Sequence, residues 1–106
     1  MPSDKNFVSY IAEQARHAGI VTTKSMIGEY LIYCDGIYVA LVSDNLVFVK
    51  PSPEGKTWIG EVVEKPPYPG AKPCYFIESR FEDEKWFSEL IMITMVALSW
   101  KKKQKK

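Results

Sequence analysis

Residues 29–50 read EYLIYCDGIYVALVSDNLVFVK. Short apolar and aromatic runs in this stretch predict three strands, at Glu29 to Cys34, Ile37 to Val42 and Leu46 to Lys50. Asp35-Gly36, between the first two runs, is a strong hairpin signal because a type I′ turn needs a positive φ at both central residues. Asp44-Asn45 predicts a second tight turn. The stretch therefore predicts an antiparallel meander of three strands.

The predicted strands are apolar on both faces. On the first strand, Tyr30 and Ile32 point one way while Leu31 and Tyr33 point the other. A strict period of two divides the second strand into two sets, Val39 with Leu41 and Tyr38 with Ala40 and Val42. An antiparallel sheet with one solvated face normally alternates apolar and polar residues. We therefore expect the second face to be covered, and a second copy of the chain is the cover that we predict.

A helix and then a short extended piece are predicted before the meander. Ser3 or Asp4 caps the helix, Phe7, Tyr10 and Ile11 follow helical spacing, and Gly19 is the expected end. The extended piece runs from Val21 to Met26.

Proline and apolar patterns organise the second half of the chain. Ser52 and Pro53 predict the start of a short inserted helix, and residues 66–70 read as a stiff, extended linker. A further strand is predicted at Cys74 to Ile77. The last helix is expected from Glu82 or Asp83 to about Ser99. Its apolar residues cover far more than one stripe, which indicates burial on most sides, in the core or against a partner.

Length and charge indicate one domain with a tail. The chain has 106 residues, of which 46% are hydrophobic and 25% charged, and a formal net charge of +1. Residues 1–100 hold nine basic and 13 acidic residues, a net charge of −4, while 101–106 read KKKQKK. We predict a folded domain over 1–100 and a disordered lysine-rich tail over 101–106. The start lacks the long apolar run of a signal peptide and no segment is long enough to span a membrane, so a cytoplasmic location is expected.

Four motifs in the chain resemble a known family. Residues 26–36 follow the pattern Met-x-Gly-Glu-Tyr-x-x-Tyr-x-x-Gly. Val-Lys-Pro at 49–51 resembles a strand-ending motif, Pro-Tyr-Pro-Gly-Ala-Lys-Pro at 67–73 is similar to a loop before the last strand, and Phe-Ser-Glu-Leu at 87–90 occupies the place of a C-terminal helix signature. In this order and over most of residues 7–98, the motifs resemble the N-terminal domain of the TfoX (Sxy) regulators of DNA-uptake competence.

The resemblance implies a fold and a role. The fold is α+β in two layers, similar to secretion chaperones: an N-terminal helix, an antiparallel meander sheet of about four to five strands with a short inserted helix, and a long C-terminal helix. The implied role is non-enzymatic and close to transcriptional regulation. Full-length regulators carry a second, helical domain where this chain ends in lysines, so the chain resembles the short single-domain members.

Residues with catalytic or metal-binding chemistry lack the patterns that such sites need. Gly55-Lys56-Thr57 has the ending of a phosphate-binding loop, but position 50 is a lysine where that loop has a glycine. His17, Cys34 and Cys74 include no closely spaced pair of ligands, as a zinc site would. We therefore predict no catalytic residue, no metal site and no cofactor.

The remaining candidates form a possible binding surface. Glu29 lies on an apolar strand and needs a partner, either in an ion pair with Lys50, Lys72 or Arg16, or in a groove that meets a ligand or peptide. The candidate binding residues are Gly28, Glu29, Tyr33, Lys50, Tyr68 and Lys72.

The leading functional prediction is a homodimeric protein-interaction domain with an unknown protein partner, acting as a transcription co-regulator. One alternative is weak, sequence-independent binding of nucleic acid through the tail, by Lys101, Lys102, Lys103, Lys105 and Lys106. Another is a small-ligand pocket lined by Glu29, Tyr33, Tyr68 and Lys72.

Overall fold

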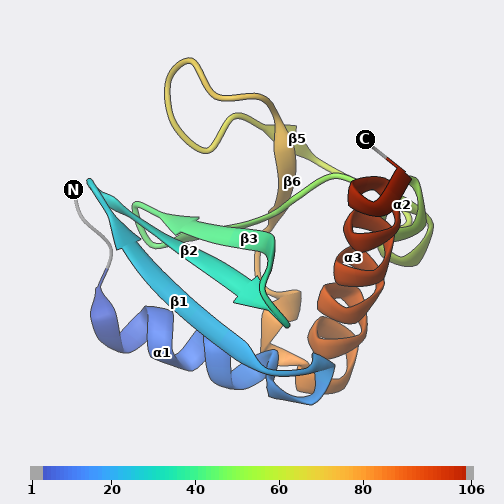
Figure 1. Ribbon diagram of the computed structural model, residues 1–106. Helices are drawn as coiled ribbons and strands as arrows, with labels where there is room; N and C mark the ends of the chain where they lie inside the picture. The colour runs from blue at the N-terminus through green and yellow to red at the C-terminus, as the bar shows by residue number, and fades with distance from the viewer. Residues whose placement is uncertain (1–3, 105–106) are drawn as a thin grey trace.

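The computed structural model describes residues 4–104, with side chains described for residues 4–100. It is an α+β fold in which two helices pack on one face of a six-stranded antiparallel sheet (Figure 1). The helices are α1 (Lys5–Gln14), α2 (Pro53–Ile59) and α3 (Glu84–Gln104), and two short 3₁₀ turns are η1 (Arg16–Ala18) and η2 (Arg80–Glu82). The strands are β1 (Val21–Met26), β2 (Glu29–Cys34), β3 (Ile37–Ser43), β4 (Leu46–Val49), β5 (Glu64–Lys65) and β6 (Cys74–Ile77).

The sheet has the order β1-β2-β3-β4-β6-β5, with every neighbouring pair antiparallel. The α+β class is confirmed, but the sheet has more strands than the four to five expected. The piece from Val21 to Met26 is a full six-residue strand, since each of its residues pairs with β2. The two-residue strand β5 was missed because so short a run carries no alternation of its own.

Turn and cap residues act locally as the sequence predicts. Asp35 and Gly36 have φ of 50° and 81°, and Asp44 and Asn45 have 53° and 59°, which are the positive values of type I′ hairpins. The Asp4 side chain accepts a hydrogen bond from the backbone N–H of Asn6, and so caps α1; Ser3 lies outside the described residues.

The inserted helix α2 also begins as predicted. Pro53 occupies its first turn, and Ser52 Oγ accepts the Gly55 N–H at 2.9 Å. This cap explains Gly55-Lys56-Thr57 as a helix start, because the Gly55 N–H is bonded to Ser52 rather than open to a phosphate.

Two helix ends differ from the expectation. The α-helical part of the first helix ends at Gln14, and the chain tightens into η1 before Gly19. A side chain at Gly19 would place Cβ 2.8 Å from Asp35 Oδ1, so this position needs glycine for close approach. The last helix α3 continues beyond Ser99 to Gln104. The predicted disorder of the tail stays a prediction, and residues 105–106 lie outside the described part.

The main core lies between the sheet and the helices. Ile11 of α1 and Phe87, Leu90 and Ile91 of α3 are fully buried there against residues of β2, β3 and β4. Gln14 of α1 is bonded to both neighbouring elements: its Nε2 donates to the Phe81 carbonyl of η2 at 3.0 Å, and its own carbonyl accepts from Ser88 Oγ of α3 at 2.8 Å.

A bulge in β3 makes the predicted facing of that strand wrong. Ile32 pairs with Ala40 and Tyr33 pairs with Tyr38, so Val39 is an extra residue. Val39 and Ala40 both belong to the main core, whereas Leu41 lies on the opposite face and Tyr38 packs beside it there. Because the period of two breaks at the bulge, Val39 and Leu41 do not share a face, and Tyr38 leaves the face of Ala40.

Candidate functional site

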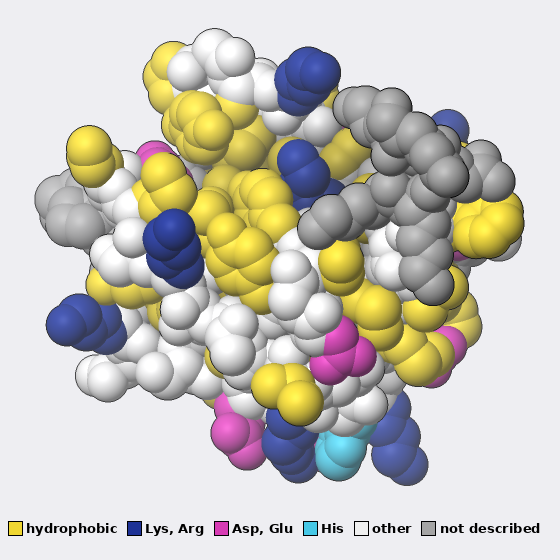
Figure 2. Space-filling model, viewed as in Figure 1, with side chains coloured by type: hydrophobic (Ala, Val, Ile, Leu, Met, Phe, Trp, Pro, Cys, Tyr) yellow, Lys and Arg dark blue, Asp and Glu magenta, His cyan; other side chains and the backbone are white. Residues whose placement is uncertain are grey.

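The sheet face opposite the helices, called the open face below, carries a second apolar cluster. Leu41, Phe48 and Cys74 are buried there, and Leu31, Tyr38 and Phe76 pack around them. Lysine side chains cover two of the rings: Lys50 Nζ lies 4.9 Å from the Tyr38 ring centroid and Lys65 Nζ lies 4.5 Å from that of Phe76. In Figure 2 hydrophobic side chains gather over β3 and below the β5–β6 loop, with Lys or Arg side chains beside them.

Tyr38 is the residue at which two of the predicted binding residues, Tyr33 and Lys50, meet. Its ring lies 5.7 Å from that of Tyr33 and carries Lys50 on it. Burial, above all, raises the pKa of the Tyr38 hydroxyl well above its usual range, and the neighbouring ionisable groups raise it further: Cys74, Tyr68, Tyr33 and Glu29. The structure therefore brings Tyr33 and Lys50 together at Tyr38, whereas Glu29 lies at the other end of β2, opposite Ser43. Sequence reasoning missed Tyr38 because only the bulge turns it to this face.

For two of the predicted binding residues, Gly28 and Lys72, the structure shows a role of the backbone. Gly28 forms the β1–β2 turn with a φ of +78°, and a Cβ there would meet nothing within 4 Å. The turn geometry, not the approach of a ligand, thus explains this glycine. The Lys72 carbonyl accepts a hydrogen bond from the Cys74 thiol at 3.8 Å.

The predicted ion pair of Glu29 is not found in the described part of the chain. Arg16 instead pairs with Glu84 at 2.8 Å and with Glu13 at 3.5 Å. These contacts link α1 and η1 to the start of α3. Glu29 is half-buried at the start of β2, where it lies opposite Met26 and Ser43.

The two thiols lie in different clusters, Cys34 in the main core and Cys74 on the open face. Burial raises the pKa of both, which keeps them protonated and unreactive. Within residues 4–104, no three side chains among His, Cys, Asp and Glu lie together as a metal site would need.

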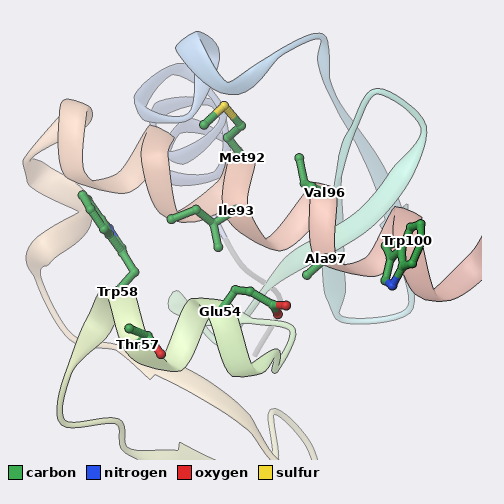
Figure 3. A pocket seen from close by; sticks show the side chains of 8 residues that line it. All are labelled: Glu54, Thr57, Trp58, Met92, Ile93, Val96, Ala97 and Trp100. Carbon is green, nitrogen blue, oxygen red and sulfur yellow. The ribbon is translucent and has the colours of Figure 1, made fainter.

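A groove with a volume of about 770 Å³ lies between α2 and α3 (Figure 3). Side chains from both helices line it: Glu54, Thr57, Trp58, Met92, Ile93, Val96, Ala97 and Trp100. The Trp58 indole is fixed because its Nε1 donates to the Trp86 carbonyl at 3.2 Å. Val96 and Trp100 are 57% and 62% exposed. Glu54 is the single charged residue among the eight.

The groove follows from the sequences of its two helices. At the start of α2, Gly55 leaves room for the Ser52 cap, because a Cβ at this position would lie 2.8 Å from Ser52 Oγ. Toward α3 the same Cβ would make only an ordinary contact, 3.6 Å from Leu90 Cδ1. On α3, the core uses Phe87, Leu90 and Ile91. Other apolar residues of the helix line the groove: Met92, Ile93, Val96, Ala97 and Trp100. The wide apolar coverage of the last helix was the sequence signal for this surface, although the sequence did not say which residues stay exposed.

Comparison with known proteins agrees with the motifs. Residues 13–98 match the TfoX N-terminal domain family. The chain belongs to the TfoX N-terminal domain family. It is also 30% identical over 105 residues to the "uncharacterized 12.7 kDa protein in trpE 5′ region" of Spirochaeta aurantia, a match that covers 99% of this chain and 91% of that protein.

The groove of this TfoX N-terminal domain falls mostly inside the matched residues. Of the lining side chains, only that of Trp100 lies beyond residue 98. None of the helices in the described part of this domain has the length and hydropathy to cross a membrane.

Proposed function

We propose that this TfoX N-terminal domain is a non-enzymatic protein-interaction domain that binds an apolar helical segment of a partner protein in the groove between α2 and α3. In the setting that the family implies, the partner belongs to the transcriptional regulation of DNA uptake. The observation that carries the proposal is the exposure of Trp58, Val96 and Trp100 along one apolar groove. Large side chains exposed together mark interaction sites, and tryptophan contributes most per residue to binding.

The shape of the groove favours an elongated occupant. Its α3 side runs from Met92 to Trp100, which is about 12 Å along a helix axis at 1.5 Å per residue. This length matches the apolar face of two helical turns of a partner, with anchors at i, i+3 or i+4, and i+7. The side chains that line it come from two helices and not from loops, so little backbone ordering is needed on binding (Figure 3).

The charge of the groove indicates which charged residues the partner should carry. Glu54 lies in the first turn of α2 and is the charged residue among the described side chains of the lining. A basic residue at the edge of the partner's apolar face would meet this carboxylate. The proposed partner is therefore an amphipathic helix with an apolar stripe flanked by lysine or arginine.

Site-specific photo-crosslinking tests the proposal. A benzoylphenylalanine replaces Val96 in the groove or, as the matched control, Val63, which is 52% exposed outside it. We expect the probe at 96 to capture one partner protein in cells, through a helical peptide identified by mass spectrometry, and the probe at 63 not to capture it.

Three results would contradict the groove as a partner site. The first is equal capture at the two positions, the second is capture of a second copy of this chain alone, and the third is labelling of a small molecule without any protein. The last two would replace the proposed partner with a dimer or a ligand.

A further inference from the structure

The outer edge of β1 (Val21–Met26) is a free edge of the sheet, because among the described strands β1 pairs with β2 alone. Five of its six residues are exposed. α1 lies beside the strand (Figure 1), and a groove of about 500 Å³ separates the two. Small side chains dominate the lining of this groove, including Ser9, Ala12 and Thr23. The edge is therefore open to another strand.

The hydrogen bonds to β2 determine which backbone N–H and C=O groups of β1 point outward, away from the sheet. The Asp35 N–H donates to the Ile20 carbonyl at 2.8 Å, so the polar groups of Ile20 face β2. Because these groups alternate in direction along a strand, those of Val21, Thr23 and Ser25 face outward. They form a row of three N–H and three C=O groups at two-residue spacing, which is the template that another strand needs.

We propose that a second copy of this chain occupies the edge, with the two β1 strands antiparallel and a twofold axis at Thr23. Outward-facing residues must lie opposite one another, which places Thr23 opposite Thr23 and Val21 opposite Ser25 of the other copy. The sheets of the two copies then join into one continuous sheet. This interface is separate from the groove between α2 and α3 and does not depend on the partner proposed there.

The side chains of β1 select this register. It places Ile20, which is 74% exposed, opposite Met26 of the other copy, which is 49% exposed, and the twofold axis repeats that pair. Both are exposed apolar side chains at the two ends of the strand. Lys24 lies opposite Thr22. A shift of the axis to Lys24 would oppose two lysines, which like-charge repulsion disfavours.

The dimer would also extend the open face. Val21 packs on the main core, so the alternate residues Ile20, Thr22, Lys24 and Met26 belong to the face that carries Leu31. The Ile20–Met26 pairs would therefore lie on that face, between the two copies. The second copy then adds to the sheet at its edge, and does not cover its face as the sequence alone had led us to expect.

The concentration dependence of the molecular mass tests whether the dimer forms. Sedimentation velocity from micromolar to millimolar concentration should show the mass rising from 12.1 kDa toward twice that value. Thr23→Pro removes one outward N–H, which a proline on an edge strand tolerates, and should stay monomeric with an unchanged circular dichroism spectrum. Thr23→Val keeps the N–H and should dimerise, and so should Val96→Glu in the separate groove. A monomer at millimolar concentration would overturn the proposal.

Cysteines on the same face of β1 test the register without disturbing the backbone. In the proposed dimer the two Thr23 Cα atoms are about 5.5 Å apart, as in hydrogen-bonded antiparallel pairs, and a disulfide can span this distance. The two Ser25 Cα atoms are about 14 Å apart, four residues along the strand. Diamide should therefore link Thr23→Cys into a dimer and leave Ser25→Cys monomeric. Equal linking of the two variants, or linking of Ser25→Cys alone, would overturn the register.

Discussion

The open face of the sheet and the groove between α2 and α3 are both apolar surfaces outside the main core, yet they are built differently. On the open face, Leu41 and Phe48 are only 1% and 2% exposed, because aromatic rings and lysine side chains of the same chain cover them. In the groove, Val96 and Trp100 keep more than half of their surface exposed. An apolar composition thus predicts that a surface is covered, but only the packing tells whether the chain covers it by itself.

The difference predicts that removing an aromatic ring has a large effect on stability at the open face and a small one in the groove. Phe48→Ala should lower the free energy of unfolding by about 3–5 kcal/mol, the usual cost of deleting a buried phenylalanine. Trp100→Ala should change it by less than about 0.5 kcal/mol, as at other exposed positions. Urea denaturation of the two variants measures both. Equal losses would show that the groove is a structural part of the core and would remove the contrast.

A charge in the groove should separate binding from stability. Val96→Glu is expected to weaken partner capture at least tenfold, about 1.4 kcal/mol, because it buries a carboxylate in the apolar contact. Val63→Glu adds the same charge outside the groove and should leave capture unchanged. The melting temperatures of the two variants should agree with that of the wild type. If Val63→Glu lost as much binding as Val96→Glu, net charge rather than the groove would decide the interaction.

Alkaline pH should destabilise the open face through Tyr38. The pKa of Tyr38 is raised in the folded state, so the unfolded chain gives up this proton at lower pH than the folded chain does. The contribution of Tyr38 to stability is therefore complete below pH 10, its unfolded value, and is lost progressively above it. Tyr38→Phe should reduce the fall in stability above pH 10, followed by urea denaturation at several pH values. Trp100→Phe, in the groove, should leave the fall unchanged.

Local signals predicted much of the fold. The Asp35-Gly36 and Asp44-Asn45 turns, the Ser52 cap and the antiparallel meander all depend on a few neighbouring residues, whose backbone preferences act without the rest of the chain. The bulge at Val39 could not be predicted, because it depends on how β3 pairs with β2. Its effect reaches the candidate site, since it turns Tyr38 toward Tyr33 and Lys50.

The groove was predictable in part. The excess of apolar residues on the last helix indicated a covered surface, but dividing that surface between core and groove requires the position of α2. The predicted ion pair of Glu29 failed for a related reason. The sequence shows which residues are charged, but not that the fold places Arg16 at the start of α3, where it forms an ion pair with Glu84.

Removal of residues 101–106 should have the smallest effect on both surfaces. All the described side chains of the groove lie before residue 101, and the open face is formed by strands, so neither partner capture nor the unfolding free energy should change beyond error. The predicted nucleic-acid contact, by contrast, rests on the five lysines of this segment. The full chain should bind duplex DNA weakly, with log K falling against log salt by a slope of at most about 4 to 5, and the truncated chain should not bind. Fluorescence anisotropy at several salt concentrations measures this slope. Binding that survives the truncation would move the contact to the folded domain, whose net charge of −4 over residues 1–100 repels phosphate.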